Sequence, residues 1–282
     1  MAITAKDIKA LRQKTGAGMM ACKRALEESG GDEGGAEALL KERGLVEVEK
    51  RADRATLEGR VFVHQDEGKA ALLALACETD FVARNELFVA AGARMAALAC
   101  AGALRGPDSA IEALVSELAG LIKENIAVKG MAFFEAGPDE SLDAYVHGEG
   151  GIGVVVKASI GARGQPGSRT ISPFLHDLAL HVAAFDPLYV EESKIPESYR
   201  QEREAAFREE MAEDQRLRGK PEKMLEGILS GKLRKHFASI SLLDQNFVKD
   251  ETISVAEALR RQAAEAGIAF SITDFARLSI KQ

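Results

Sequence analysis

The chain of 282 residues carries a formal net charge of −7 and contains 46% hydrophobic and 29% charged residues. This composition is ordinary for a globular protein of about two domains. The acidic charge argues against a direct nucleic-acid partner, because phosphate binding relies on Lys and Arg. No apolar run approaches the roughly 20 residues that span a bilayer, and the N-terminus is not typical of a signal peptide. Three scattered cysteines predict no disulfide framework, so we expect a cytoplasmic protein without a membrane partner.

The first 44 residues predict three short helices. Thr4 and Asp7 match a variant of the capping box, with Asp in place of Glu at its second position. The glycines of TGAGMM (15–20) end the first helix, and Asp32 is a suitable cap for the third. The charged stretch 47–55 has almost no apolar residues and predicts a linker helix or tether.

The apolar pattern changes to strands after Leu57. The segments 57–64 and 69–78 predict an antiparallel hairpin around a QDEG turn. An alanine-rich helix is expected over 84–104. Ser109 begins a Ser-x-x-Glu capping box for the next helix, which a short strand with the sequence MAFFEA follows.

The second half predicts a further mixture of strands and helices. A helix is expected to start at Ser172 and Pro173, which are a good cap and a good first-turn residue. The charged segment 198–220 and the helix that follows it predict a helical hairpin. Strands are expected over 141–148, 152–160 and 268–275. Ser254 and Glu257 form a further capping box, which predicts a helix before the last strand.

Two patterns typical of enzymes have the wrong context. Gly148, Gly150 and Gly153 spell G-x-G-x-x-G, but a β-branched run follows where a dinucleotide site needs a helix, so we expect a hairpin turn. His176 and His181 are five residues apart, which is not the spacing that places two metal ligands on one helix face. An enzyme that uses Cys77 with a distant histidine remains open as an alternative.

Three short stretches contain candidate functional residues: TDFV (79–82), KENI (123–126) and YVHG (145–148). TDFV places an aromatic beside a carboxylate at the end of an apolar strand, where polar turn residues are usual. Each stretch also has a purely structural interpretation. Asp80 could cap a helix, Phe81 could belong to the core, and His147 could satisfy a turn.

The chain resembles the bacterial elongation factor Ts family from about residue 3 to about residue 275. The resemblance is carried by ITAKDIKALRQKTGAGMMACKRAL, ETDFVARN, the HG pair before IGVVV, HVAAFDPLYV, GKPEKMLEGILSGKLRKH and LLDQNFV. TGAGMM and TDFV in this order are its most specific part. Residues 123–126 read KENI where the family commonly has GENI.

The resemblance implies an α+β architecture. A ubiquitin-associated-like module of three helices would be followed by two subdomains of antiparallel three-stranded sheets with helices, interrupted by a helical hairpin that supports dimerisation in some members. The implied boundaries are 1–54 for the N-terminal module and linker, 55–140 for the core N-subdomain, 141–182 with 228–265 for the core C-subdomain, 183–227 for the hairpin and 266–282 for the C-terminal module.

The resemblance also implies a function, which is guanine-nucleotide exchange on elongation factor Tu. Thr79, Asp80, Phe81 and Val82 would dislodge the Mg²⁺ ion of the GDP-bound partner, and GTP would then bind. Further contacts with the partner's nucleotide domain and with a second domain would come from Lys23, Ile126, His147 and Gly148. No catalytic residue, metal site or cofactor is implied. A binding or chaperone module without exchange activity is the alternative.

Overall fold

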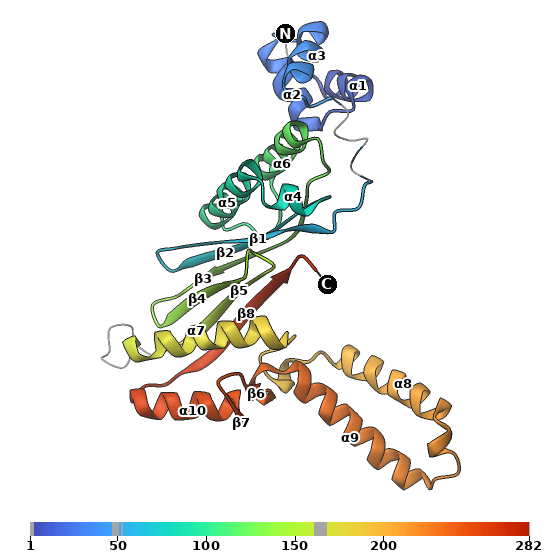
Figure 1. Ribbon diagram of the computed structural model, residues 1–282, viewed down its shortest axis with the longest axis vertical. Helices are drawn as coiled ribbons and strands as arrows, with labels where there is room; N and C mark the ends of the chain where they lie inside the picture. The colour runs from blue at the N-terminus through green and yellow to red at the C-terminus, as the bar shows by residue number, and fades with distance from the viewer. Residues whose placement is uncertain (1–2, 47–50, 52, 161–167, 282) are drawn as a thin grey trace. The chain divides into compact units, whose positions relative to one another are not determined.

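The computed structural model describes residues 3–46, 51, 53–160 and 168–281 (Figure 1). In the last of these ranges, side chains are described from residue 171 onwards. The chain forms two compact units. The first comprises Met1–Gly137, Ala144–Val155 and Ala276–Gln282, and the second comprises Pro138–Asp143 and Val156–Phe275. The predicted linker at 47–55 lies mostly outside the described residues. The finer domain boundaries that the family resemblance implies stay predictions.

The three predicted N-terminal helices are present as α1 (Ala5–Thr15), α2 (Met19–Glu28) and α3 (Glu33–Glu42). The Thr4–Asp7 capping box is confirmed, because each side chain hydrogen-bonds to the backbone of the other residue. Asp32 caps α3 by accepting from the Gly35 amide, as predicted. The small core of this module consists of buried side chains from all three helices, the α1–α2 turn and the turn after α3: Leu11, Ala17, Ala21, Cys22, Ala25, Leu26, Ala36, Leu40 and Leu45.

The TGAGMM turn joins this module to a helix of the same unit, α6 (Ser109–Ile122). Gly16 has a positive φ of 63°, which L-residues with a side chain rarely adopt, and it ends α1. A Cβ atom on Gly18 would lie 2.9 Å from the Ser116 Oγ of α6. The second glycine therefore permits a close approach between the module and α6.

The first unit contains an antiparallel sheet of β1 (Glu58–Asp66), β2 (Lys69–Cys77) and β3 (Ala127–Glu135), with β2 in the centre. The predicted 57–64 and 69–78 hairpin is confirmed, whereas the third strand starts earlier than the MAFFEA segment. Figure 1 shows α5 (Glu86–Ala101) and α6 on one side of this sheet. A buried core joins these helices to the sheet, with Phe62, Leu73, Phe88, Met95 and Ile111 among its members.

Both predicted helices of this unit are present, but one predicted cap is wrong. Asp108, and not Ser109, caps α6, because its backbone is extended and its carboxylate accepts from the amides of Ala110 and Ile111. The helix expected over 84–104 is α5, and the single turn α4 (Asp80–Ala83) precedes it. Asn85 separates the two and caps α5 by accepting from the Leu87 amide.

A second three-stranded sheet has the order β4–β5–β8, formed by Glu140–His147, Ile152–Ser159 and Ser271–Ser279. The last strand begins three residues later than predicted. The first two glycines of G-x-G-x-x-G form the turn between β4 and β5, with a φ of 59° at Gly148 and 97° at Gly150, and Gly153 lies at the start of β5. A side chain on Gly153 would collide with Val61 of β1. The predicted hairpin turn is confirmed, and a strand follows where a dinucleotide site would need a helix.

The second unit is mostly helical. The predicted hairpin is confirmed as α8 (Glu197–Glu213) and α9 (Glu222–Ile240), which lie side by side (Figure 1). Ser254 caps α10 (Val255–Ala266) as predicted. Two short strands, β6 (Asn246–Phe247) and β7 (Asp250–Ser254), pair next to it.

Helix α7 (Ser168–Phe185) begins four residues before the predicted start at Ser172. Pro173 therefore lies inside the helix instead of in its first turn. The apolar face of α7 continues through the proline, and Ile171, Leu175 and Leu178 are each at most 1% exposed. Burial of this face outweighs the loss of one backbone hydrogen bond at the proline. In the described part of the chain, no helix is long and apolar enough to cross a membrane.

Candidate functional site

The turn at residues 79–82 presents an aromatic side chain at the surface. Strand β2 ends at Cys77, and Thr79 then caps α4 through its hydroxyl, which accepts from the Val82 amide at 3.4 Å. Phe81 is 83% exposed, whereas Val82 packs against the buried core of the first unit. Because large aromatic side chains are usually at least partly buried, the exposure of Phe81 makes it the strongest candidate for contact with another molecule.

Asp80 is the first residue of α4, and its side chain is half exposed. Its carboxylate lies 3.8 Å from the Arg84 guanidinium one turn later. The interpretation of Asp80 as the helix cap is wrong, because the cap is Thr79. An exposed ion pair of this kind contributes little to stability, so the Asp80 carboxylate is available for polar contacts outside the chain.

The loop that joins α6 to β3 holds the start of this turn. One oxygen of the Glu124 carboxylate accepts from the backbone amides of Glu78 (3.0 Å) and Thr79 (3.1 Å). Its other oxygen accepts from the Thr79 hydroxyl at 2.7 Å. Hydrogen bonds to an ionised acceptor are stronger than neutral ones, so a single side chain fixes two consecutive residues before α4.

The contact between the two segments is reciprocal. The Glu78 carboxylate accepts from the Asn125 amide at 2.6 Å, and the Asn125 side chain donates to the Arg54 carbonyl at 2.7 Å. Ile126 follows directly and is 5% exposed as part of the core of the first unit. The structure thus places Ile126 under the turn, with almost none of its surface available to another protein.

The other end of the turn is held by Arg60, a residue of β1. Its Nε donates to the Ala83 carbonyl at 2.7 Å, at the C-terminal end of α4. Its Nη2 lies 3.4 Å from the Glu149 carboxylate, which is also 3.6 Å from the Arg84 Nε. These charges join the turn to the tip of the β4–β5 hairpin.

The hairpin tip contains the predicted residues His147 and Gly148, and both are exposed. The Tyr145 hydroxyl lies 2.9 Å from the His147 Nδ1. Between the tip and α4 is an open groove of about 430 Å³, whose lining includes Asp80, Arg84, His147, Glu149 and Lys281. The structure therefore brings Asp80 and His147 to the same groove, although they are 67 residues apart in the chain.

Lys23 lies on α2, away from the groove-lining residues of the same unit. Its side chain is about half exposed and lies 3.8 Å from the Glu27 carboxylate one turn later. Met19, at the start of the same helix, is 56% exposed. Exposed methionines are common at binding surfaces that accept more than one partner geometry.

The chemistry of this region does not suit covalent catalysis. The Cys77 side chain is buried, and its thiol donates to the Thr79 carbonyl. Burial and then the nearby carboxylates of Glu124 and Glu58 raise the pKa of Cys77 to about 12. At pH 7 only about one such thiol in 10⁵ is ionised, so Cys77 is a poor nucleophile. The described residues contain no group of three or more His, Cys, Asp or Glu that could hold a metal ion.

Three of the residues that hold the turn were not predicted from the sequence: Glu124, Arg60 and Glu149. Glu124 lies in the KENI segment, for which the sequence predicts a partner contact only at Ile126. Arg60 is a charged residue within an apolar strand, a weak indication of an internal partner. Glu149 carries no local signal beyond its place in a turn.

Comparison with known proteins identifies the family. The sequence profile described as Elongation factor TS matches residues 78–282. Elongation factor Ts of Treponema denticola is 39% identical over 273 residues, which cover 97% of this chain and 96% of that protein. The proteins of the same name from Borreliella burgdorferi (38% identical, 99% of both chains) and Treponema pallidum (39%, 97% of both chains) are similarly related. The chain therefore belongs to the elongation factor Ts family.

Proposed function

We propose that this protein binds elongation factor Tu in its GDP form and promotes GDP release by displacing the Mg²⁺ ion, after which GTP binds. Family membership supports a role as a translation elongation factor. The expected compartment is the cytoplasm. In this proposal the chain is an exchange factor that makes and breaks no covalent bond.

The physical requirement for exchange is thermodynamic linkage. If the factor binds the nucleotide-free partner more tightly than the nucleotide-bound one, the nucleotide must bind more weakly when the factor is present. Each tenfold acceleration of GDP release requires a barrier lower by about 1.4 kcal/mol. The energy comes from contacts that are made better as the nucleotide leaves.

The observation that carries this proposal is the exposed Phe81 side chain. Burial of a Phe side chain in another protein is worth roughly 1.5–3 kcal/mol, which corresponds to about one to two orders of magnitude in rate. In the proposed mechanism Phe81 enters a slot near the partner's magnesium site, and Asp80 makes polar contacts beside it. Loss of the Mg²⁺ ion weakens GDP binding, because the ion is the largest positive charge on the phosphates.

The remaining predicted residues have supporting roles in this proposal. His147 and Gly148 contact a second domain of the partner from the other side of the groove. Lys23 grips the outside of the nucleotide domain. Ile126, which lies in the core below the turn, contributes by supporting the turn from within. Dimerisation through the α8–α9 hairpin stays a prediction.

The test is a stopped-flow measurement of labelled GDP release from elongation factor Tu. With Phe81→Ala we expect release at saturating factor to slow by about 10- to 100-fold, since the burial energy of the ring is lost. Leu98→Ala is the matched control, because Leu98 is also an exposed apolar residue (37%) but lies near the C-terminal end of α5, outside the turn. Full exchange by a correctly folded Phe81→Ala variant would remove the assignment of Phe81.

The same experiment addresses a binding or chaperone module without exchange activity. Such a protein would bind elongation factor Tu but leave the rate of GDP release at its spontaneous value. The exposed aromatic lies on a turn whose backbone is anchored at both ends, and this preorganisation favours its insertion during exchange.

A further inference from the structure

We propose that Glu124 is a positioning residue for nucleotide exchange, which fixes the orientation of the Thr79–Val82 turn and thereby presents Phe81. This inference rests on the proposed function. It assigns Glu124 a polar role distinct from the core support that Ile126 provides, and the role does not require Glu124 to touch the partner.

The hydrogen bonds form a continuous connection from Glu124 into α4. Glu124 accepts the Thr79 hydroxyl proton at 2.7 Å, and the same hydroxyl accepts from the Val82 amide at 3.4 Å. A hydroxyl has one proton to donate, so Glu124 determines where that proton points and leaves the lone pairs of Thr79 directed at α4. Phe81 lies in the chain between Thr79 and Val82, the two residues that the second of these hydrogen bonds connects.

The Glu124 carboxylate also determines the direction of the chain before α4. It accepts from two consecutive amides, those of Glu78 and Thr79, at the point where β2 has ended and no strand pairing directs the backbone. Glu78 returns a hydrogen bond to the Asn125 amide. These contacts lock the two segments together although they are 45 residues apart in the sequence.

A four-residue helix such as α4 is too short to hold its own geometry in water. Its C-terminal end is anchored by Arg60 through the Ala83 carbonyl. Without Glu124 the turn would keep its core contacts through Val82 and Ala83 but would lose the anchor at its N-terminal end. Phe81 would then sample several orientations, and only a fraction of them would be competent for insertion.

The test separates presentation of Phe81 from binding to the partner. GDP release from elongation factor Tu is measured over a range of concentrations of Glu124→Ala, Glu124→Gln and the control Glu112→Ala, which removes an exposed carboxylate from the other end of α6. We expect Glu124→Ala to lower the maximal rate about tenfold, or about 1.4 kcal/mol, with a change of less than about threefold in the half-saturating concentration.

Two comparisons distinguish positioning from a general loss of structure. Glu124→Gln keeps one oxygen acceptor and should recover most of the rate. In a Phe81→Ala background, Glu124→Ala should slow release by less than about twofold further, because residues that act as a unit are non-additive. If Glu124→Ala fails to fold, Glu124→Met replaces it, because a side chain of similar length keeps the packing but accepts none of the three hydrogen bonds, and it should slow release to the same extent.

The inference is overturned if folded Glu124→Ala exchanges at the wild-type rate, or if it slows release equally with and without Phe81. The outcome for the proposed function is separate. If Phe81→Ala slows release and the Glu124 variants do not, only the positioning role is lost. If Phe81→Ala itself exchanges normally, the exchange mechanism through Phe81 fails and the positioning role fails with it.

Discussion

Two regions of the molecule use one polar side chain to hold a nearby turn, and they do so in opposite environments. In the first unit, Glu124 accepts three hydrogen bonds at the surface, beside the exposed Phe81. In the second unit, His181 is fully buried. Its Nε2 donates to the Gln245 Oε1 at 2.9 Å, and its Nδ1 accepts from the Val248 amide at 3.2 Å.

The two hydrogen-bond networks therefore differ in whether they mainly stabilise the fold or mainly orient a surface turn. Gln245 continues the buried one by donating to the carbonyls of Ser239 and Phe185, so it joins α7, α9 and the β6 turn in the interior. There a lost partner leaves unpaired polar groups without water, which is costly. At the surface water can replace a lost partner, so the Glu124 connection affects orientation more than stability. The following predictions test this contrast, from the largest expected effect to the smallest.

Replacement of the buried histidine should have the largest effect. His181→Leu leaves the Gln245 Oε1 and the Val248 amide unpaired in the interior, and we expect the free energy of unfolding to fall by about 3 kcal/mol. Chemical denaturation measures this value. Exchange activity per folded molecule should stay within about twofold. An unchanged free energy of unfolding would show that the buried hydrogen bonds of His181 do not stabilise the fold more than those of Glu124 do.

Removal of the second anchor of the turn should have an intermediate effect. Arg60→Met keeps the apolar part of the side chain but loses the donor to the Ala83 carbonyl, which is worth about 1–2 kcal/mol. We expect maximal GDP release to slow by about five- to tenfold. Glu149→Gln serves as the control, because it removes the exposed ion pairs with Arg60 and Arg84 but leaves the Ala83 contact, and it should change release by less than about twofold. Equal effects of both changes would contradict the role of the Ala83 contact.

The buried histidine also predicts a pH dependence of stability. Burial lowers the pKa of His181 below its usual value, and the Gln245 hydrogen bond only partly offsets this effect. The unfolded chain therefore binds a proton that the folded chain does not, so stability is complete above about pH 6.5 and is lost as the pH falls below it.

His181→Gln should flatten this dependence between pH 7 and pH 5, by at most about 1.4 kcal/mol per pH unit for one proton. His236, whose pKa burial also lowers, retains its own contribution in the variant. Urea denaturation at several pH values measures the slope. A slope as steep as that of the wild type would exclude His181 as its source.

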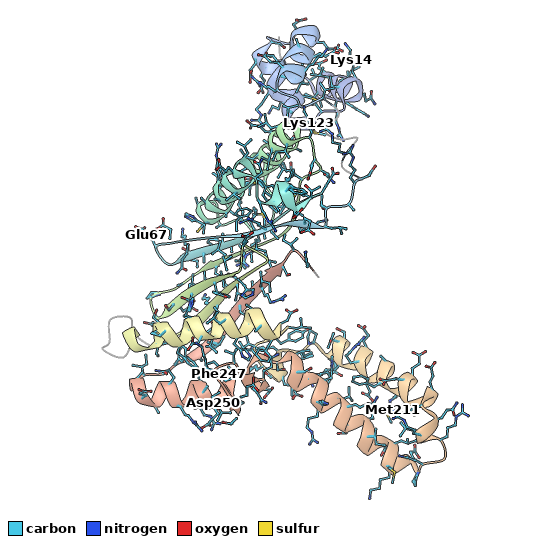
Figure 2. All side chains as sticks on the ribbon, viewed as in Figure 1. Lys14, Glu67, Lys123, Met211, Phe247 and Asp250 are labelled. Atoms are coloured by element: carbon cyan, nitrogen blue, oxygen red, sulfur yellow. The ribbon has the colours of Figure 1, made fainter. Side chains whose placement is uncertain are left out.

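The smallest effect concerns the first residue of KENI. Lys123 ends α6 in the left-handed conformation, with a φ of 69°, and its Nζ lies 3.2 Å from the Gly44 carbonyl (Figure 2). Glycine, which the family commonly has here, adopts this conformation at no steric cost. We expect Lys123→Gly to raise the free energy of unfolding by about 0.5–1 kcal/mol. A loss of stability would show that the contact with Gly44 outweighs the backbone strain.

Much of the local structure followed from short sequence patterns. The Thr4–Asp7 box, the Asp32 cap, the 57–78 hairpin and the Gly148–Gly150 turn each depend on residues a few positions apart, and all are confirmed. Local patterns failed where two signals competed. Asp108 and Ser109 can both cap a helix, and the structure uses the aspartate, whose carboxylate accepts two amide hydrogen bonds.

The sequence by itself determined the family, the order of the longer helices and strands, and an aromatic residue at the end of a buried strand, because these depend on residue type and close spacing. Only the tertiary structure decided that Phe81 is exposed while Ile126 is buried, and that Glu124 and Arg60 hold the turn from 45 and 23 residues away. Such contacts arise when strand pairing brings distant segments together, and neither residue type nor local spacing records which side chain will then lie within hydrogen-bonding distance.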